Sequence, residues 1–410
     1  MPALTSEDRR TYQANVWKLY FFHFLMNFQL WWSIWVIYLQ DLRGFSLTQV
    51  TILEAVFWVT AVVAEVPTGA IADRHGRKVS LVLGASCITL AVFVFGMATT
   101  YPVILLSYGA WGFGVAFLSG AEHALLFESL KELGRERDFQ ASAGRLAALF
   151  SLGALAGGLA GAPIAAATDL STPVLLSAAI AAPAVFVALT MREPPLPEGG
   201  VRPGYGALLF ESAATALRLP AVRTMLLLSS LVTACTFGPI LFMQPFLTGH
   251  DVELRLIGFL VTPAQVTAII GALVAYRVTT VMGPRGAFII APAILLGSYL
   301  LLGTWDAVFA FAAFPILAFI NNLLMPTAEN YLNQRIPSSH RATILSLRTM
   351  LVSLWIALLV PSLGAIADSS SLPIAFLVTA GVASVTIPIA LLLWLRADAS
   401  GDQLVAVAET

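Results

Sequence analysis

The sequence predicts an all-α polytopic membrane protein whose twelve transmembrane helices form two pseudo-symmetric six-helix bundles. The first observation is composition: of 410 residues, 58% are hydrophobic and 11% are charged, and the mean hydropathy is +0.85. Soluble domains are about one quarter charged and less than half apolar. The second observation is a series of long stretches without charged residues, and the third is the uneven placement of Lys and Arg along the chain.

The charge-free stretches mark the expected helices, because a membrane-spanning helix needs about 20 mainly apolar residues. One stretch is long enough for two helices, with a turn at Thr99-Thr100-Tyr101-Pro102, so the stretches give eleven spans. A twelfth span, near Leu47–Ala72, is interrupted only by Glu54 and Glu65. The stretches are Leu19–Gln40, Val79–Ala121, Leu146–Thr168, Leu170–Met191, Thr224–His250, Leu256–Tyr276, Gly286–Trp305, Ala307–Ala328, Thr349–Ala367 and Ser369–Leu395.

The basic residues predict the orientation of these helices. With the N-terminus in the cytoplasm and twelve spans, the inner segments contain 20 of the 22 Lys and Arg residues, and the outer loops keep Arg43 and Arg255. This distribution follows the positive-inside rule. We therefore expect a multi-pass protein of the plasma membrane, with both termini in the cytoplasm.

Charge and cysteine usage exclude several classes of function. A net charge of −1 gives no reason to expect nucleic-acid binding, and Cys87 and Cys235 both lie inside predicted spans, which excludes a disulfide framework and a thiolate metal site. The chain has no nucleotide-binding Gly-x-x-x-x-Gly-Lys-Ser/Thr loop and no cluster of His, Asp, Glu or Ser typical of an enzyme. We expect no cofactor, no metal and no catalytic activity.

The two halves repeat each other. Glu122 and Glu329 are 207 residues apart, and Arg145 and Arg348 are 203 apart, which is about half the chain length. We assign 1–191 and 221–410 to the two six-helix halves and 192–220 to a cytoplasmic linker. Within the linker, 205–219 is either a short helix on the inner membrane surface or a flexible connection.

The loop between the second and third helices carries a recognisable motif. It matches Gly-x-x-x-Asp-Arg-x-Gly-Arg-Lys/Arg and therefore resembles the loop signature of the major facilitator superfamily, while the preceding Glu65-Val66-Pro67-Thr68 resembles a variant of drug-efflux-like members. The resemblance covers nearly the whole chain and implies the two-bundle fold of that superfamily. The matching residues are Gly69, Asp73, Arg74, Gly76, Arg77 and Lys78.

This loop has a physical interpretation as a conformational latch. Gly69 permits close helix approach, and Gly76 permits a tight turn. The resemblance implies that Asp73 lies beside the start of helix 11, where the helix dipole favours a carboxylate. Asp73 would then hold the halves together on the inner side; the alternative is a basic loop that only sets topology.

Two departures from the family bear on coupling. Proton-coupled members often carry an Arg before the Gly-x-Gly pair of helix 4, and here Tyr108 stands in its place before Gly112 and Gly114. Helix 5 only partly resembles the antiporter signature, because Pro163 does not directly follow Gly161.

Charged residues inside the predicted spans are candidate functional groups, since burying them in a bilayer is costly. Glu54 and Glu65 lie eleven residues apart on one face of helix 2 and, with Glu122, are candidates for proton coupling. The alternative is a structural hydrogen bond. Two salt bridges, Glu122–Arg145 and Glu329–Arg348, are expected near the inner ends, as gates or as static braces.

Polar and aromatic residues near the middle of the helices are candidates for contact with a solute. Substrate sites of secondary transporters lie near the midplane between the repeats. The candidates are Asn27, Gln29, Trp32, Tyr108, Gln265, Asn321 and Asn322.

The leading hypothesis is a monomeric secondary active transporter that exports hydrophobic or drug-like solutes in exchange for protons by alternating access. The first alternative is a facilitator or symporter that imports a nutrient. A more remote alternative is a membrane enzyme or a sensor that does not transport.

Overall fold

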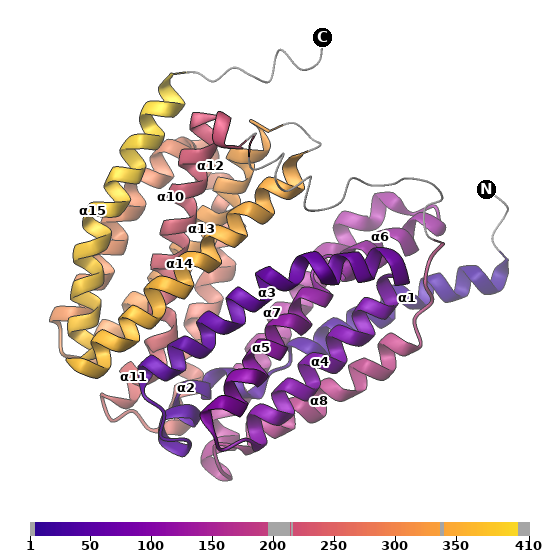
Figure 1. Cartoon of the computed structure of the whole chain (residues 1–410), viewed down its shortest axis with the longest axis horizontal. Helices are drawn as coiled ribbons and strands as arrows, with labels where there is room; N and C mark the ends of the chain where they lie inside the picture. Colours follow the sequence, from indigo (N-terminus) through magenta and orange to yellow (C-terminus); the bar gives the residue numbers. More distant parts are fainter. Residues whose placement is uncertain (1–4, 196–213, 215, 337–339, 401–410) are drawn as a thin grey trace. The chain divides into compact units, whose positions relative to one another are not determined.

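The computed structural model describes residues 5–195, 214, 216–336 and 340–400, and in these residues the regular structure is helical (Figure 1). Ten helical segments are long and apolar enough to cross a membrane. The longest, Leu254–Thr304, is divided at Gly283, whose φ of 68° is not helical. With the broken first segment counted as well, the described helices are consistent with the twelve predicted spans. The predicted helix at 205–219 lies mostly outside the described residues.

The described residues form two compact units. Unit 1 takes in the described parts of Met1–Phe45, Val56–Val201 and Glu253–Thr262, and unit 2 those of Ser46–Ala55, Arg202–Val252 and Pro263–Thr410. The first residues of α3 therefore belong to unit 2 and the rest of that helix to unit 1. The boundaries predicted at 191 and 221 stay a prediction.

Unit 1 is built around α1, which packs against α6, α7 and α8, and around α4, which packs against α5 and α8. The turn expected at Thr99–Pro102 is confirmed, because α4 ends at Met97 and α5 begins at Tyr101. The elements are α1 Ser6–Asn27, η1 Leu30–Ser33, α2 Trp35–Ile37, the π-helical turn η2 Tyr38–Leu42, α3 Leu47–His75, α4 Arg77–Met97, α5 Tyr101–Leu118, α6 Ala121–Glu132, η3 Glu136–Asp138, α7 Phe139–Ala167 and α8 Thr172–Leu189.

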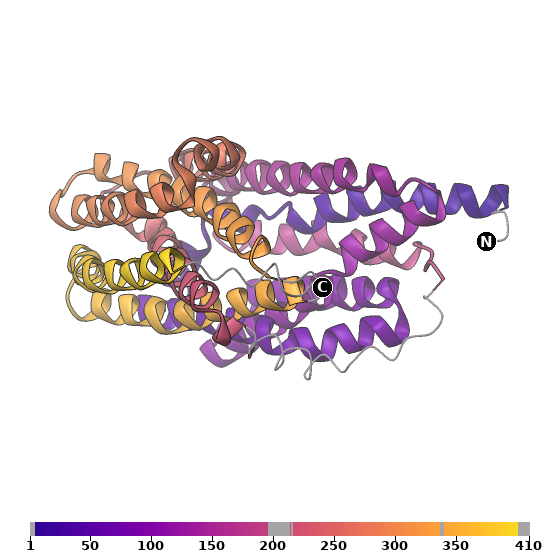
Figure 2. The ribbon, with the colours of Figure 1, turned by 90° about the horizontal axis from the view of Figure 1, so that it is seen from above.

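Unit 2 is built around α10, which packs against α13, α14 and α15. Figure 2 shows α14 and α15, in orange and yellow, running alongside each other. The Gly238-Pro239 pair ends α10 and begins a short 3₁₀ segment, since proline cannot continue the hydrogen-bond ladder. The elements are α10 Pro220–Phe237, η4 Gly238–Phe242, α11 Met243–Thr248, α12 Leu254–Thr304, η5 Val308–Ala312, α13 Ala313–Asn333, α14 Arg341–Ser369 and α15 Leu372–Ala399.

Small residues set the closest helix contacts in both units. A Cβ atom added to Gly112 of α5 would lie 2.5 Å from the Phe57 carbonyl oxygen of α3, and one added to Gly271 of α12 would collide with the Phe319 carbonyl oxygen of α13. Glycines at such positions let helix backbones approach, which is the usual way of packing helices in a membrane. This packing holds the candidate side chains in place.

Candidate functional site

The first transmembrane segment is broken at its middle. α1 ends at Asn27, Gln29 is extended (φ −108°, ψ 102°), and the 3₁₀ segment η1 begins at Leu30. Two side chains at the break donate to backbone carbonyl groups of α1. The side-chain amide of Asn27 donates to the His23 carbonyl (2.8 Å), and that of Gln29 donates to the Met26 carbonyl (3.0 Å). Non-helical backbone at membrane depth is tolerated only where protein or a cavity covers it.

A row of glycines on α7 covers this break. Gly153, Gly157 and Gly161 follow each other at intervals of four residues, so they lie on one face of the helix. A Cβ added to Gly157 would lie 2.7 Å from the Gln29 carbonyl oxygen, and one added to Gly161 would collide with that of Leu30. The partial antiporter signature of the sequence is therefore a packing surface for the broken helix.

The aromatic residues beyond the break form a packed cluster. Trp31 lies 5.1 Å from Trp111 and 5.7 Å from Trp32 between ring centroids, and Tyr108 lies 5.4 Å from Phe95. Tyr108 is buried, and the void that it lines measures only about 10 Å³. Tyr108, proposed from the sequence as a cavity residue, is thus a member of a closed aromatic core in this structure.

Unit 1 contains a partly buried carboxylate–imidazole pair. His23 Nδ1 of α1 lies 2.5 Å from Glu122 Oε2 of α6, and their side chains are 14% and 9% exposed. Gly120, with φ 75°, separates α5 from α6 and places Glu122 in the first turn of the new helix. A carboxylate at a helix N-terminus has the favourable sign for the helix dipole.

This pair corrects one sequence prediction. Glu122 was expected to form a salt bridge with Arg145, but its ionic partner among the described residues is His23, and Arg145 is exposed on α7. Gly120 separates α5 from α6, so Glu122 lies in the first turn of a new helix, where it contacts His23 of α1.

Unit 2 contains the predicted pair of Glu329 on α13 and Arg348 on α14. Arg348 is buried at 4% exposure, and its Nη1 lies 3.9 Å from Glu329 Oε1. Arg348 also donates to two hydroxyl groups of α10, those of Ser229 (3.2 Å) and Thr233 (3.0 Å). The guanidinium of α14 thus contacts two other helices of the same unit, α10 and α13.

The other candidates are distributed over both units. Asn321 of α13 accepts a hydrogen bond from Thr236 of α10 (3.0 Å), and Asn322 donates to the Ala318 carbonyl of its own helix (3.0 Å). Gln265 of α12 is half-buried. On α3, Glu54 is buried in the part that belongs to unit 2, whereas Glu65 is half-buried in the part that belongs to unit 1.

The loop between α3 and α4 is held by a residue that sequence reasoning missed. Glu193, just after α8, accepts hydrogen bonds from the N–H groups of Arg77 and Lys78 (both 2.6 Å) and so caps α4. A Cβ on Gly76 would lie 2.5 Å from the Glu193 carboxyl carbon, and the φ of Gly76 is 98°. Gly76 is needed for both reasons. The sequence feature that could have indicated this cap is an acidic residue two positions after the end of predicted helix 6.

Within this loop Asp73 contacts its own neighbour. It accepts a hydrogen bond from Arg77 (2.8 Å), its side chain is 56% exposed, and Arg77 also approaches Glu128 at 3.9 Å. A Cβ added to Gly69 meets no atom within 4 Å. The role of this motif as a latch stays a prediction. Arg74 is exposed.

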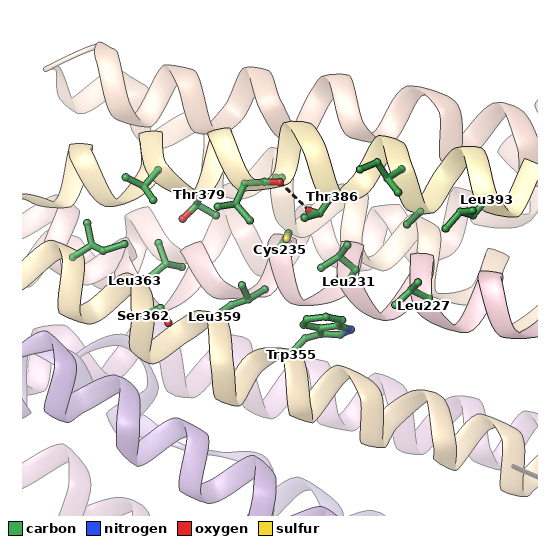
Figure 3. Close-up of a pocket in the computed structure, with 16 residues that line it drawn as sticks. Leu227, Leu231, Cys235, Trp355, Leu359, Ser362, Leu363, Thr379, Thr386 and Leu393 are labelled. Atoms are coloured by element: carbon green, nitrogen blue, oxygen red, sulfur yellow. Dashed lines mark hydrogen bonds between the residues drawn. The ribbon is translucent and has the colours of Figure 1, made fainter. Parts of the chain in front are cut away.

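A separate apolar groove lies between α10, α14 and α15 of unit 2 (Figure 3). Its volume is about 340 Å³, and Trp355, Leu359, Cys235 and Leu231 line it. The hydroxyls in its walls bond to carbonyls of their own helices, as Thr386 does to Val382 (2.9 Å), so they offer little to a polar ligand. The charged candidates lie elsewhere, and the described residues contain no group of three or more potential metal ligands.

Two units of apolar helices, a broken first helix and buried charged residues are typical of membrane transport proteins. The sequence profile of the Major Facilitator Superfamily matches residues 17–358, and the chain therefore belongs to that superfamily. No curated protein sequence matches the chain.

Solved structures of transporters share the fold. The nucleoside transporter NupG superposes with a TM-score of 0.76 at 13% identity, over 93% of this chain and 99% of that one. A bacterial homologue of the human lysosomal transporter Spinster, inward-facing and unoccupied, gives 0.71 at 16% identity over 97% and 98%. A POT family transporter in complex with 5-aminolevulinic acid gives 0.70 at 14% identity over 94% and 96%.

Proposed function

We propose that this protein exports small hydrophobic or drug-like organic solutes across the plasma membrane in exchange for protons, by alternating access, as a monomer with both termini in the cytoplasm. The observation that carries the proposal is the contact between His23 and Glu122. Ionisable groups inside a membrane protein are costly and usually functional. Imidazole is the side chain whose charge ordinarily changes between pH 5 and 8.

The pair is placed to link protonation to the solute path. His23 and Asn27 lie on the same helix one turn apart, and the Asn27 side chain bonds to the His23 carbonyl directly before the break in α1. Broken helices near the midplane are where transporters of this kind bind solutes. Loss or gain of a proton between His23 and Glu122 would therefore act on the end of α1, beside Gln29 and Trp32.

The surroundings of His23 and Glu122 are mainly uncharged. Among the described residues, no other ionisable side chain lies within 4.0 Å ion-pair distance of His23 or Glu122. The facing group from α7 is the Phe150 ring, 6.1 Å from the imidazole. Glu54 and Glu65 remain further candidates for proton transfer on α3.

The solute is best matched by the residues around the break. Tryptophan rings with few fixed charges suit apolar or cationic organic molecules, which aromatic faces attract. Gln29 and Asn27 in unit 1, and Asn321, Asn322 and Gln265 in unit 2, are the proposed hydrogen-bonding contacts.

Transport into proteoliposomes tests the function. A fluorescent hydrophobic cation should accumulate at least tenfold more with an imposed pH gradient than without one. Glu122→Gln and His23→Gln should remove the gradient-dependent part, whereas Glu136→Gln, an exposed carboxylate of η3, should not change it. Transport by the native protein that ignores the gradient would instead identify a facilitator. Accumulation of a nutrient in cells that express the protein would favour import.

A further inference from the structure

Two helices of this chain end in the same pentapeptide. Gly69-Ala70-Ile71-Ala72-Asp73 lies at the end of α3, and Gly364-Ala365-Ile366-Ala367-Asp368 lies at the end of α14. Both helices are 29 residues long, and both contain a Val-Pro pair shortly before the pentapeptide. They are helices 2 and 11 of the fold, the middle helices of two of its three-helix repeats. The two aspartates therefore occupy equivalent places, each near the C-terminal end of its helix.

Asp368 caps the start of α3. The N–H groups of Leu47 and Thr48 donate to its two carboxylate oxygens (3.0 and 2.7 Å), and the Thr48 hydroxyl donates to one of them (2.5 Å). The next N–H, of Gln49, donates to Ser46 Oγ (3.2 Å), and Gln49 Oε1 accepts from the Ser46 N–H (3.1 Å). This reciprocal pair is a capping box. Asp368 supplies the acceptors that the capping box lacks and brings a negative charge to the positive end of the helix dipole.

Gly364 makes this cap possible. A Cβ atom at Gly364 would lie 2.8 Å from the Leu47 carbonyl oxygen and would collide with the Thr51 hydroxyl. Since Asp368 is four residues further along the same helix, it lies on the same face as Gly364. The glycine thus brings α14 against the first turn of α3, and the aspartate then reaches its N–H groups.

In the first copy of the pentapeptide, the glycine is not packed and the aspartate caps no helix among the described residues. Gly69 has no atom within 4 Å of an added Cβ, and Asp73 is 56% exposed and bound to Arg77. One glycine–aspartate pair is packed and caps a helix, whereas the other is open. The identical residues can support both conditions, so sequence does not dictate which copy is engaged.

We propose that Asp368 is a positioning residue of the transport cycle, which latches α14 to the start of α3 at the end away from the basic loops and alternates with Asp73. The proposal rests on the alternating access proposed above. Rocking of two halves opens one end as it closes the other. Each aspartate would therefore cap the partner helix in only one half of the cycle, Asp368 when its own end is closed.

Electron–electron distance measurements in liposomes test this latch. Spin labels at Thr100→Cys and Asp306→Cys, in a Cys87→Ser, Cys235→Ser background, would report the separation of the loops before α5 and after α12. Asp368→Asn should raise the ratio of open to closed distances at this end about tenfold, which corresponds to about 1.4 kcal/mol. Asp73→Asn should lower the ratio, and the double variant should return it towards that of the native protein.

Matched variants keep the test decisive. Asp169→Asn removes a carboxylate that caps α8 through the Ser171 and Thr172 N–H groups, and it should leave the ratio unchanged. Thr48→Val removes only the hydroxyl donor and should shift the ratio in the same direction as Asp368→Asn, but less, which guards against misfolding of the latter. The latch would be overturned if the distances were unchanged in Asp368→Asn and Thr48→Val. It would also be overturned if Asp73→Asn and Asp368→Asn shifted the ratio of open to closed distances in the same direction. The distances are measured without solute or gradient, so they do not depend on proton coupling.

Discussion

Glu122 of α6 in unit 1 and Glu329 of α13 in unit 2 lie 207 residues apart, near the ends of the fourth and tenth predicted membrane spans, yet their partners differ. Glu122 contacts His23 of α1, whereas Glu329 faces Arg348 of α14. A guanidinium stays charged at any physiological pH, while an imidazole does not. The two halves therefore have a carboxylate at corresponding places but pair it with different partners, and the proton coupling proposed above would use only the pair with His23.

The loops at Gly76 and Gly283 differ in a similar way. Both glycines have positive φ, 98° and 68°, and both precede the next helix. Glu193 accepts from the first two N–H groups of α4, but Pro284 has no N–H to offer. In unit 2 Asp398 instead accepts from side chains, those of Arg285 (2.6 Å), Tyr331 (2.6 Å) and Arg335 (3.0 Å). The backbone turn is preserved, and the stabilising contacts have moved from backbone to side chains.

The largest expected effect comes from breaking the fixed pair. Arg348→Ala should lower the free energy of unfolding by about 3 kcal/mol, because it leaves Glu329 and the Ser229 and Thr233 hydroxyls without their shared cation. Chemical denaturation in detergent would measure it. His23→Ala should cost about 1 kcal/mol, the usual net value of one intramolecular hydrogen bond. Equal losses in the two variants would show that the pairs do not differ as described.

The next largest difference in stability is expected between substitutions of Asp398 and Glu193, the carboxylates that stabilise the turns at Gly283 and Gly76. Asp398→Asn should cost about 2 kcal/mol, because it weakens three side-chain contacts around a carboxylate that is buried at the end of α15. Glu193→Gln should cost about 1 kcal/mol, the usual value of a helix cap. Thermal unfolding of both variants side by side tests the order, with Glu136→Gln as the exposed control. A larger loss for Glu193→Gln would reverse our view of the two loops.

Sequence reasoning predicted well where the cause was local. Thr99–Pro102 separates two predicted helices through its own backbone restrictions, and this interruption is present. The pair of Glu329 and Arg348 also follows, since each residue was placed near the inner end of its helix.

The break in α1 could not be predicted in this way. The glycine row on α7 that packs against it lies more than 120 residues later in the chain, and the local sequence around Gln29 contains neither glycine nor proline. The contact of His23 with Glu122 has the same origin, because it depends on how α1 packs and on the turn at Gly120. Asp368 does not follow from the repeat of the halves, because its pentapeptide recurs at an offset of 295 residues and not at about half the chain length.

Exchanging the partner should convert one kind of pair into the other. His23→Arg would give unit 1 a permanent cation like that of unit 2, so accumulation driven by a pH gradient should fall about tenfold, to its level without a gradient. Binding of the solute, measured by fluorescence quenching, should stay within about threefold of the native value. Gradient-driven accumulation that survives this exchange would move proton coupling away from the pair, and Glu54→Gln and Glu65→Gln would then be the variants to compare.

The smallest expected change in stability concerns the residues that cap α8 and α15. The cap of α8 in unit 1 is a carboxyl group, which titrates, and the cap of α15 in unit 2 is a hydroxyl group, which does not. Hydrogen bonds from Ser171 and Thr172 lower the pKa of Asp169 from 3.8 to about 2, whereas Ser371 caps α15 through the Ile374 N–H (3.4 Å). A carboxyl whose folded pKa is depressed stabilises the fold above its unfolded pKa, and this contribution is lost as the pH falls towards 2. Asp169→Asn should therefore cost about 0.3 kcal/mol between pH 5 and 7, the value of an exposed charge at a helix end, and less at pH 3. Ser371→Ala should cost the same at every pH in this range. Melting temperatures of both variants against the native protein from pH 3 to 7 decide it, and a constant difference for Asp169→Asn would mean that the carboxylate charge contributes nothing there.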